Sequence, residues 1–220
     1  MSISENIKNI EKFLPHDVKL LAVSKTRTLE EMEEAYDYGL RDFAENKVQE
    51  LIYKEENFHK DVRWHLIGKL QTNKVKYIVG KVHLIHSLSS IKLLNKIEEL
   101  YGRKDLIANT LIQINIGREE SKSGILLEDL EEMLEAVEKC KNVKVKGIMV
   151  IIPKGDENIN RSYFKKTHDI FLSLKNKKFN NINMEILSMG MTNDYKVAVE
   201  EGSNMVRVGT GIFGERDYNI

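Results

Sequence analysis

The residue best suited to covalent chemistry in this sequence is Lys25, which follows the apolar run Leu20-Leu21-Ala22-Val23 and a single serine. A lysine that closes a buried strand is held at the edge of the core. Partial desolvation at such a position lowers the pKa of the amine, and a neutral amine is nucleophilic toward an aldehyde. The same position also suits a solvated surface lysine, so other residues must decide between the two interpretations.

Two segments rich in small residues, 188–192 and 209–214, have the composition of an anion-binding site. Small and glycine-rich loops let backbone N–H groups approach a phosphate closely. The spacing Gly209-x-Gly211-x-x-Gly214 matches the dinucleotide-binding pattern, but only six residues follow Gly214, too few for the helix and strand that this pattern requires. We therefore interpret both segments as a phosphate site, with ordinary turn glycines as the alternative.

Arg207 stands two residues before the second of these segments. A guanidinium stays protonated and can only donate, so an arginine facing a pyridine nitrogen would keep that nitrogen unprotonated. Such a ring is a weaker electron sink than one paired with a carboxylate, which disfavours transaminase-like chemistry. Lys25, Arg207 and the two segments together supply an amine for an aldehyde, a donor for a ring nitrogen and a cradle for a phosphate. Arg207 alone would also fit a surface salt bridge.

These residues lie at the ends of short apolar runs that alternate with longer segments of helical period. The runs are apolar on successive residues, as in parallel strands that are covered on both faces. Regular units without a linker favour a (β/α)8 TIM barrel over an open doubly wound sheet. The eight expected strands are Val18–Ser24, Leu40–Ala44, Val62–Ile67, Val82–His86, Thr110–Ile116, Val145–Ile151, Met184–Ser188 and Asn204–Val208.

We expect a single domain over residues 1–220, with an extra N-terminal helix that carries Ile3, Ile7 and Ile10 on one side. In (β/α)8 barrels the site lies at the C-terminal ends of the strands, and the loops after strands seven and eight often hold a phosphate. Lys25 follows the first expected strand, and the two small-residue segments follow the seventh and the eighth. All three features should therefore meet at one end of the barrel.

The second expected strand ends in Glu45-Asn46, the third in Trp64-His65-Leu66-Ile67-Gly68 and the fourth in His86-Ser87. Each could offer a hydrogen bond at the mouth of the barrel, although local caps and satisfied core groups are the simpler interpretation. His83 and His86 lie three residues apart on a strand, so their side chains point to opposite faces and make a poor metal pair. We therefore predict no metal.

The composition predicts a soluble, cytoplasmic protein. Lys and Arg together number 34, as do Asp and Glu, so the net charge of +0 gives no general attraction to nucleic acid or to membranes. The single cysteine, Cys140, excludes an intramolecular disulfide and a multi-cysteine zinc site. The N-terminus lacks the apolar core of a signal peptide, and no run approaches a membrane span. We expect a monomer, because no apolar stripe stands out beyond the core faces.

The sequence resembles the pyridoxal phosphate homeostasis proteins, the YggS/PROSC family, over nearly its whole length. The matching stretches are Ala22-Val23-Ser24-Lys25-Thr26, Glu45-Asn46 with Val48-Gln49-Glu50, Trp64-His65-x-Ile67-Gly68-x-Leu70-Gln71-x-Asn73-Lys74, Ser121-Lys122-Ser123-Gly124, Leu187-Ser188-Met189-Gly190-Met191 and Val206-Arg207-x-Gly209-Thr210-x-Ile212-Phe213-Gly214. Any one stretch is weak, but the ordered set is highly specific. The sequence departs from the family pattern at Ala44, where glycine is usual, and at Lys69, where proline is usual.

The resemblance implies a fold like the N-terminal barrel of alanine racemase, and pyridoxal 5′-phosphate (PLP, a form of vitamin B6) as the cofactor. It implies that Lys25 holds PLP as a Schiff base, that Arg207 faces the pyridine nitrogen and that Asn46 lies near the ring hydroxyl. The residues that it places around the phosphate are Ser188, Gly190, Gly209 and Thr210.

The leading hypothesis is a protein of intracellular PLP homeostasis that sequesters the cofactor or passes it to apo-enzymes, with little or no turnover and no catalytic residue. The chain ends at Ile220, soon after the eighth strand, so we expect the second domain of alanine racemase to be absent. No second base is apparent opposite Lys25. Lys122 could supply a second amine at the mouth, or be a solvated loop lysine.

Two alternatives remain open on the sequence alone. One is a PLP-dependent amino-acid racemase of narrow or weak activity. The other is a barrel that binds a different phosphorylated metabolite without a covalent link. Interconversion of amino-acid enantiomers, and a borohydride-stable adduct on Lys25, are the two observations that separate these alternatives from a PLP carrier.

Overall fold

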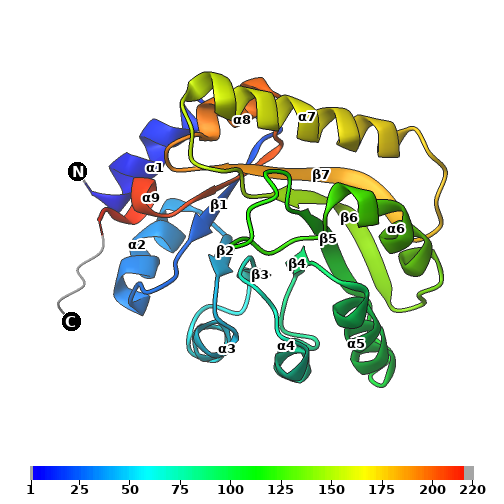
Figure 1. Ribbon diagram of the computed structural model, residues 1–220. Helices are drawn as coiled ribbons and strands as arrows, with labels where there is room; N and C mark the ends of the chain where they lie inside the picture. Colours follow the sequence, from blue (N-terminus) through cyan, green and yellow to red (C-terminus); the bar gives the residue numbers. More distant parts are fainter. Residues whose placement is uncertain (1, 216–220) are drawn as a thin grey trace.

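The computed structural model of the chain describes residues 2–215 and is built around a closed barrel of parallel strands, in the order β1-β2-β3-β4-β5-β6-β7-β8 (Figure 1). Strand β8 closes the ring by pairing with β1, where Arg207 lies opposite Leu21. The predicted (β/α)8 barrel is therefore confirmed. The prediction of one domain over residues 1–220 includes residues 1 and 216–220, which lie outside the described residues.

Every predicted strand overlaps an observed one, with ends that differ by a few residues. The strands are β1 (Lys19–Val23), β2 (Asp42–Glu45), β3 (Arg63–Leu66), β4 (Leu84–Leu88), β5 (Ala108–Ile114), β6 (Val143–Val150), β7 (Ile182–Met191) and β8 (Met205–Val208). The α-helices are α1 (Ile3–Glu11), α2 (Leu29–Tyr38), α3 (Val48–Asn57), α4 (Val75–Ile78), α5 (Ile91–Gly102), α6 (Leu130–Glu138), α7 (Glu157–Lys175), α8 (Tyr195–Glu200) and α9 (Thr210–Phe213). Two short 3-10 helices, η1 (Thr72–Lys74) and η2 (Leu127–Asp129), precede α4 and α6.

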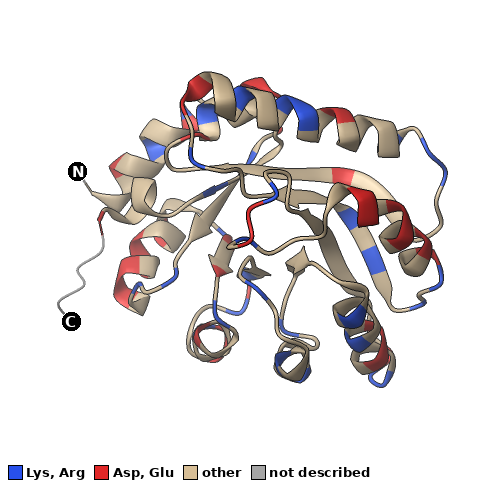
Figure 2. Ribbon diagram, viewed as in Figure 1, with Lys and Arg blue, Asp and Glu red and all other residues tan. Residues whose placement is uncertain are grey.

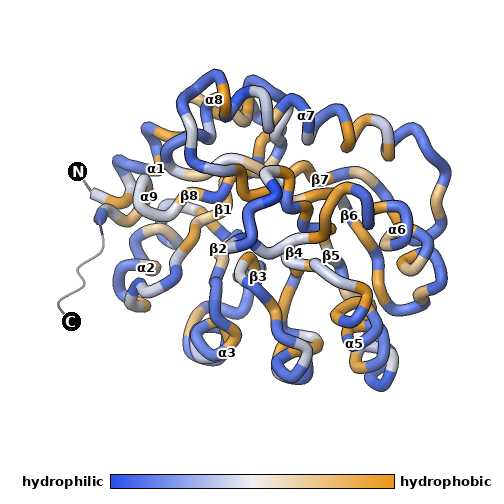
Figure 3. Tube along the Cα trace, viewed as in Figure 1, coloured by the Kyte–Doolittle hydropathy of each residue, from blue (hydrophilic) through white to orange (hydrophobic). Residues whose placement is uncertain are grey.

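The strands are buried on both faces because helices surround the barrel while side chains fill its interior. Leu20 and Ala22 pack beneath the helices, whereas Leu21 and Val23 pack with the residues inside the barrel. This double burial explains why each strand is a continuous apolar run rather than an alternating one. In Figure 3 the hydrophobic colour follows the strands and the inner sides of the helices, and the outer surface is hydrophilic.

Local signals in the sequence set the ends of the helices. Thr28 begins α2 with a capping box, in which its hydroxyl accepts from the N–H of Glu31 and the Glu31 carboxylate accepts from the N–H of Thr28. Gly39 and Gly202 follow α2 and α8 with φ values of 120° and 93°. These positive values favour glycine and let the chain turn back toward the next strand.

The predicted N-terminal helix is present as α1, with Ile7 and Ile10 buried. It packs against α2 and against α9, where the Asn6 side chain donates to the backbone O of Ile212 at 2.9 Å. Helix α1 therefore supports the last turn of the described chain. Within residues 2–215, no helix combines the length and the apolar character needed to cross a membrane.

Candidate functional site

A cavity of about 710 Å³ opens at the C-terminal ends of the strands. Its size falls in the range of small-ligand sites, roughly 300–1,000 Å³. Five of the predicted site residues line it, namely Lys25, Asn46, Arg207, Gly209 and Thr210. They come from the ends of β1, β2 and β8, which only the closed barrel brings together.

Lys25 stands on a short turn that is tied down on both sides. Ser24 is fully buried, and Thr26 has a φ of 65°, a left-handed conformation that is uncommon for threonine. The N–H of Thr26 donates to Oε1 of Glu50 at 2.5 Å, and the carbonyl of Ser24 accepts from Nζ of Lys54 at 2.7 Å. These two contacts fix the backbone from which the Lys25 side chain starts, as a preorganised site requires.

Lys54 is the centre of a buried polar network beneath this turn. Its Nζ also donates to Oε1 of Glu45 and to Oε1 of Glu50, both at 2.8 Å, and the Ser24 hydroxyl donates to Oε1 of Glu45 at 2.7 Å. Lys54 is 2% exposed and Glu45 is 0% exposed. Burying an ammonium group is costly unless its donors are used. The three donors of Lys54 have three acceptors here, which is why a buried lysine is tolerated.

Sequence reasoning did not single out Lys54 or Glu50. A signal was available, because Lys54 lies three residues after Leu51 and therefore on the apolar stripe of α3 that Val48 begins. A charged residue on the buried stripe of a helix needs a buried partner. Glu45, at the end of the strand before this helix, provides it.

Glu45 is a second titratable group in this network. Burial raises the pKa of its carboxyl to about 7, and the contacts with Lys54 and Ser24 oppose that change only in part. Its other oxygen, Oε2, is buried without a hydrogen-bond partner among the described residues. The network therefore holds a carboxyl that titrates near neutral pH and is hydrogen-bonded to the residue before Lys25.

Arg207 is 3% exposed and is held firmly against the floor of the cavity. Its Nη1 donates to O and Oγ of Ser188 at 2.8 and 2.7 Å, and its Nη2 donates to the carbonyl of Val150 at 2.8 Å. An arginine has five N–H donors. Within the described residues, Nε–H and the second hydrogen of Nη2 have no protein acceptor, so both are available to a ligand.

Burial lowers the pKa of Arg207 to about 10, and Asp194 opposes this effect. The guanidinium therefore stays charged at neutral pH and suits a ligand atom that only accepts. Ser188, which was predicted beside the phosphate, is fully buried behind Arg207 and does not line the cavity. Its observed partner is the guanidinium.

Gly190 also lies away from the cavity wall. It has a φ of 93°, and a Cβ at this position would stand 2.6 Å from Cβ of Ala198 and 2.9 Å from Cα of Tyr195. Glycine is therefore needed for the close packing of β7 against α8. The chain reaches the cavity one residue after Gly190, through residues 191–194 at the end of β7 and just beyond it. A direct contact of Ser188 or Gly190 with a phosphate stays a prediction.

The loops after β7 and β8 meet at the cavity, as the barrel rule predicts. The N–H of Gly211 donates to Oγ1 of Thr192 at 3.2 Å, and Thr192, Gly209 and Thr210 all line the wall. Thr192 thus joins the two segments that were predicted to form a phosphate site. Sequence reasoning placed it in its segment but gave it no role.

Asn46 enters the cavity beside the loop after β3. A Cβ on Gly68 would stand 2.1 Å from the backbone O of Asn46, so a side chain at position 68 would displace the chain at Asn46. The neighbouring Lys69, one of the two departures from the family pattern, also lines the cavity. The substitution therefore adds a cation to the wall.

Positive charge dominates the cavity. Among the described residues that line it, one is acidic, Asp194, and five are cationic: Lys25, Lys69, Lys122, Lys154 and Arg207. In Figure 2, acidic residues gather on outer helices such as α2 and α6. The chain is neutral overall, yet this separation produces a positive potential that attracts an anionic ligand.

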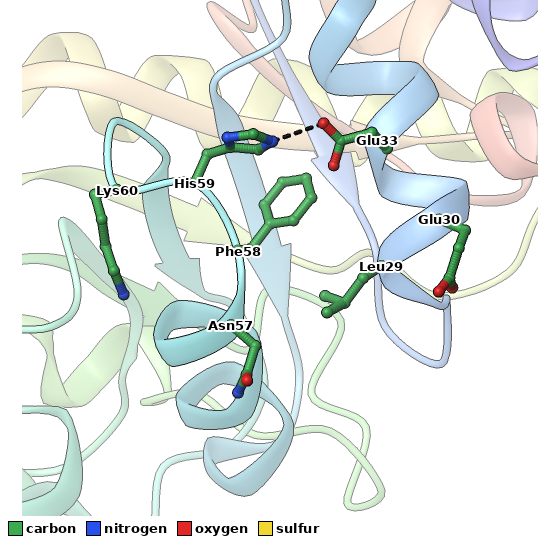
Figure 4. A pocket seen from close by; sticks show the side chains of 7 residues that line it. All are labelled: Leu29, Glu30, Glu33, Asn57, Phe58, His59 and Lys60. Carbon is green, nitrogen blue, oxygen red and sulfur yellow. Dashed lines mark hydrogen bonds and ion pairs between the residues drawn. The ribbon is translucent and has the colours of Figure 1, made fainter.

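A second hollow of about 710 Å³ lies on the outer surface, between α2 and the segment after α3 (Figure 4). Its polar groups are already paired with protein atoms. Nε2 of His59 lies 2.7 Å from Oε1 of Glu33, and Nζ of Lys60 donates to backbone carbonyls of α3. None of the predicted site residues lies there. The cavity at the end of the barrel is therefore the candidate site.

The predicted strand alternation does not apply to His83, which lies before β4 and whose ring centroid is 5.5 Å from that of His65. His86 is fully buried inside, whereas His83, which precedes β4, is exposed. His65 is also buried and lies 3.0 Å from His86 between ring nitrogens. Neither buried ring reaches the cavity wall. In the part of the chain that the structure describes, no group of three His, Cys, Asp or Glu side chains could hold a metal.

A family model described as alanine racemase, N-terminal domain, matches residues 1–217, so the chain belongs to that class of barrel. Curated relatives carry the name pyridoxal phosphate homeostasis protein. One from Aquifex aeolicus is 43% identical over 203 residues, or 91% of this chain and 88% of the relative. Another, from Pasteurella multocida, is 35% identical over 233 residues and covers 100% of both chains. The chain belongs to the pyridoxal phosphate homeostasis protein family.

Solved structures agree with this assignment. PipY of Synechococcus elongatus, with PLP bound, is 32% identical with a TM-score of 0.88, covering 96% of this chain and 100% of PipY. The structure of PipY without PLP has a TM-score of 0.91. An alanine racemase from Clostridium difficile, 16% identical with a TM-score of 0.78 over 99% of this chain and 60% of its own, shares the fold. The family resemblance predicted from the motifs is confirmed.

Proposed function

We propose that this chain binds PLP through Lys25 and acts in PLP homeostasis, by sequestering the cofactor and delivering it to apo-enzymes. The observation that carries this proposal is the placement of Lys25, Arg207 and the loops after β7 and β8 around one cationic cavity. Membership in the family supports it. So does PipY, a 32% identical protein whose structure contains PLP.

The residues around the cavity fit the polar groups of PLP. Lys25 supplies an amine for the aldehyde, Arg207 supplies spare N–H donors for the pyridine nitrogen, and Asn46 supplies an amide for the ring hydroxyl. Thr192, Gly209 and Thr210 are small or hydroxyl-bearing residues on the wall near which a phosphate would lie. Lys69, Lys122 and Lys154 add positive charge for the same anion.

The cofactor brings an electrophilic aldehyde carbon, and the chain brings the nucleophile. Lys25, as a neutral amine, would supply the nucleophile for that carbon, with one water molecule lost as the C=N bond forms. Addition of water to the bond reverses the step and releases both groups unchanged. The exposed Lys122 lines the same cavity and offers a second amine that can displace Lys25 as the cofactor leaves. Such an exchange also describes transfer to the lysine of an apo-enzyme.

Two features favour storage over racemisation. Arg207 cannot accept a proton, so its contact would keep the ring nitrogen neutral and weaken the electron withdrawal that carbanion chemistry needs. A two-base racemase also needs an acid–base group on the side opposite Lys25. Among the described residues of the cavity wall, no tyrosine, histidine or cysteine is available for that role.

Reduction with borohydride tests the covalent link directly. The protein is mixed with PLP, reduced, digested and mapped by mass spectrometry. We expect one stable phosphopyridoxyl adduct, on the peptide that contains Lys25, and its loss in Lys25→Ala. Lys76→Ala, which removes an exposed lysine from α4, is the matched control and should retain the adduct.

An unmodified Lys25, or an adduct spread evenly over surface lysines, would overturn the proposal. Rapid interconversion of amino-acid enantiomers by the loaded protein, abolished by Lys25→Ala, would instead support the racemase alternative. Transfer is tested by adding an apo-enzyme and following the gain of its activity.

We further propose that the protein acts in the cytoplasm as a monomer, without nucleic-acid or membrane partners.

A further inference from the structure

A row of buried polar side chains runs through the barrel interior below the cavity. Arg207, Ser188, His86, His65 and Asp42 come from β8, β7, β4, β3 and β2, and each is at most 6% exposed. The successive contacts are Nη1–Oγ at 2.7 Å, Oγ–Nδ1 at 3.3 Å, Nε2–Nδ1 at 3.0 Å and Nε2–Oδ1 at 2.9 Å. Side chains from five strands thus form one continuous chain of hydrogen bonds.

The donors and acceptors of this row are consistent in one direction only. The carboxylate of Asp42 only accepts, so His65 donates to it from Nε2. With both histidines neutral, this fixes the remaining links: the hydroxyl of Ser188 donates to Nδ1 of His86, and its oxygen accepts from Arg207. With Nδ1 accepting, a neutral His86 carries its proton on Nε2 and donates to Nδ1 of His65. The network therefore assigns the Nε2–H tautomer to both histidines.

Both ends of the row are anchored by charges of opposite sign. Asp42 accepts from Nε of Arg63 at 2.8 Å and from Nη2 of Arg63 at 2.5 Å, and it lies 3.9 Å from Nζ of Lys19. These contacts hold the pKa of Asp42 below its usual range. A hollow of about 530 Å³, lined by Asp42, Lys19 and Arg63, opens at this far end of the barrel. The row thus connects the two ends of the barrel.

The histidines between these anchors are neutral. Burial lowers the pKa of His65, which Asp42 opposes, and nearby His83 and Lys19 lower it further. Burial lowers the pKa of His86 well below its usual value, and His65, Arg207 and His83 act in the same direction. A protonated His86 would also lose its acceptor nitrogen and place a cation against Ser188, whose oxygen already accepts from Arg207.

We propose that His86 and His65 are positioning residues for the cofactor site, which act through Ser188 to orient Arg207. Because the row uses the hydroxyl hydrogen of Ser188, its oxygen lone pair faces the guanidinium. Both hydrogens of Nη1 are then bonded to O and Oγ of Ser188. The Nε–H and the second hydrogen of Nη2 are left for the ligand. This inference rests on the proposed function, since the ligand atom that it concerns is the pyridine nitrogen of PLP.

The first test needs no cofactor. In the cofactor-free protein with ¹⁵N-labelled histidine, NMR should show His65 and His86 as neutral Nε2–H tautomers, unchanged between about pH 5.5 and 8.5, where ordinary histidines titrate. A cationic ring, or an Nδ1–H tautomer of His86, would overturn the inference. This result is independent of whether Lys25 binds PLP.

The second test compares three variants of the PLP-loaded protein. His86→Leu removes the acceptor for Ser188, His86→Asn retains one near the position of Nδ1, and His168→Leu removes a histidine of α7, outside the row. We expect His86→Leu to weaken PLP binding about tenfold, as for loss of one charge-assisted hydrogen bond, and to alter the pH titration of the visible absorption band. His86→Asn should recover most of both properties, and His168→Leu should match the wild type.

Ser188→Ala breaks the row at its next link and keeps the test valid if His86→Leu does not fold. Ser188→Ala should reproduce the effects of His86→Leu, and the double variant should add little to either, because both act on one contact. Wild-type affinity and titration in a folded His86→Leu or Ser188→Ala would overturn the inference. Equal effects of His168→Leu and His86→Leu would also overturn it. A wild-type protein without an adduct on Lys25 would instead contradict the proposed function.

Discussion

Lys54 donates from Nζ to the backbone carbonyl of Ser24 at 2.7 Å, so a buried ammonium group on α3 holds the residue that precedes Lys25. Through this contact, an ion-pair network in the core holds the backbone on the N-terminal side of Lys25. The network also includes Glu50, which accepts from the N–H of Thr26 on the other side of Lys25. The proposed site is therefore supported from below by residues that do not line its cavity.

Removing the central cation of this network should destabilise the protein. Lys54→Met keeps most of the volume but leaves Glu45 without its cationic partner, and we expect a loss of about 3–5 kcal/mol in the free energy of unfolding. Urea denaturation followed by circular dichroism measures it. The exposed Lys76→Met on α4 should change stability by less than about 0.5 kcal/mol. Equal stability of Lys54→Met and the wild type would mean that the network is dispensable.

Glu45 should make stability fall as the pH rises toward neutrality. The pKa of its carboxyl is about 7 in the folded chain against a usual value of 4.5, so the folded state holds the proton more tightly than the unfolded state does. The contribution of Glu45 to the free energy of unfolding then decreases between pH 4.5 and about 7, by up to about 3 kcal/mol, and is flat above. The lowered pKa values of the buried His65 and His86 change stability in the opposite direction over this range, so the effect is measured as a difference. In urea titrations, the free energy of unfolding of the wild type minus that of Glu45→Gln should decrease with pH by this amount. The contribution of Asp42, whose pKa is lowered, is lost only below about pH 4.

Alanine should destabilise the protein more at position 190 than at position 39, although both glycines have a positive φ. At both positions the positive φ would strain an alanine backbone. A Cβ at position 190 would also lie 2.6 Å from Cβ of Ala198, whereas a Cβ at position 39, where φ is 120°, would have no atom within 4 Å. We expect Gly39→Ala to cost about 1–2 kcal/mol and Gly190→Ala about 2 kcal/mol more. Gly190→Ala should also weaken PLP binding, because residues 191–194 follow it into the cavity. Thermal unfolding and a PLP titration of both variants provide the comparison.

The positive potential of the cavity should speed the capture of PLP. Replacing Lys69, Lys122 and Lys154 together by glutamine should lower the association rate about tenfold at low salt, and should flatten its dependence on ionic strength. Stopped-flow absorbance measures both quantities. A control with the same net charge replaces Lys139, Lys141 and Lys178, exposed residues near the opposite end of the barrel, and should bind PLP at the wild-type rate. Equal rates in the two triple variants would exclude steering by the cavity.

Much of this fold could be predicted from the sequence because its signals are local. Apolar runs buried on both faces, helical stripes and cap residues such as Thr28 and Gly39 each depend on a few neighbouring residues. Eight such units imply a barrel, and the barrel rule then places Lys25 and the last two loops at one end. For these reasons the fold and the family were correctly predicted, whereas the role of Lys25 as a nucleophile stays a prediction.

Which side chains face one another was decided by the tertiary structure. Simple alternation would place Ser188, Gly190 and Thr192 on one face, but the pairing of β7 with β8 shifts register between Ser188 and Met191. Ser188 therefore lies inside the barrel behind Arg207, Gly190 packs against α8, and Thr192 reaches the cavity.

The partners of Lys54 and of the buried histidines were likewise set by the closed barrel. Glu45 and Lys54 meet because β2 and α3 pack together, and His65 and His86 meet because β3 and β4 are neighbours in the ring. Burial makes each of these polar groups depend on a partner, but the sequence does not say which residue that partner is. Local patterning determined the elements and their order, whereas the register of the closed barrel determined the contacts among polar side chains in its interior.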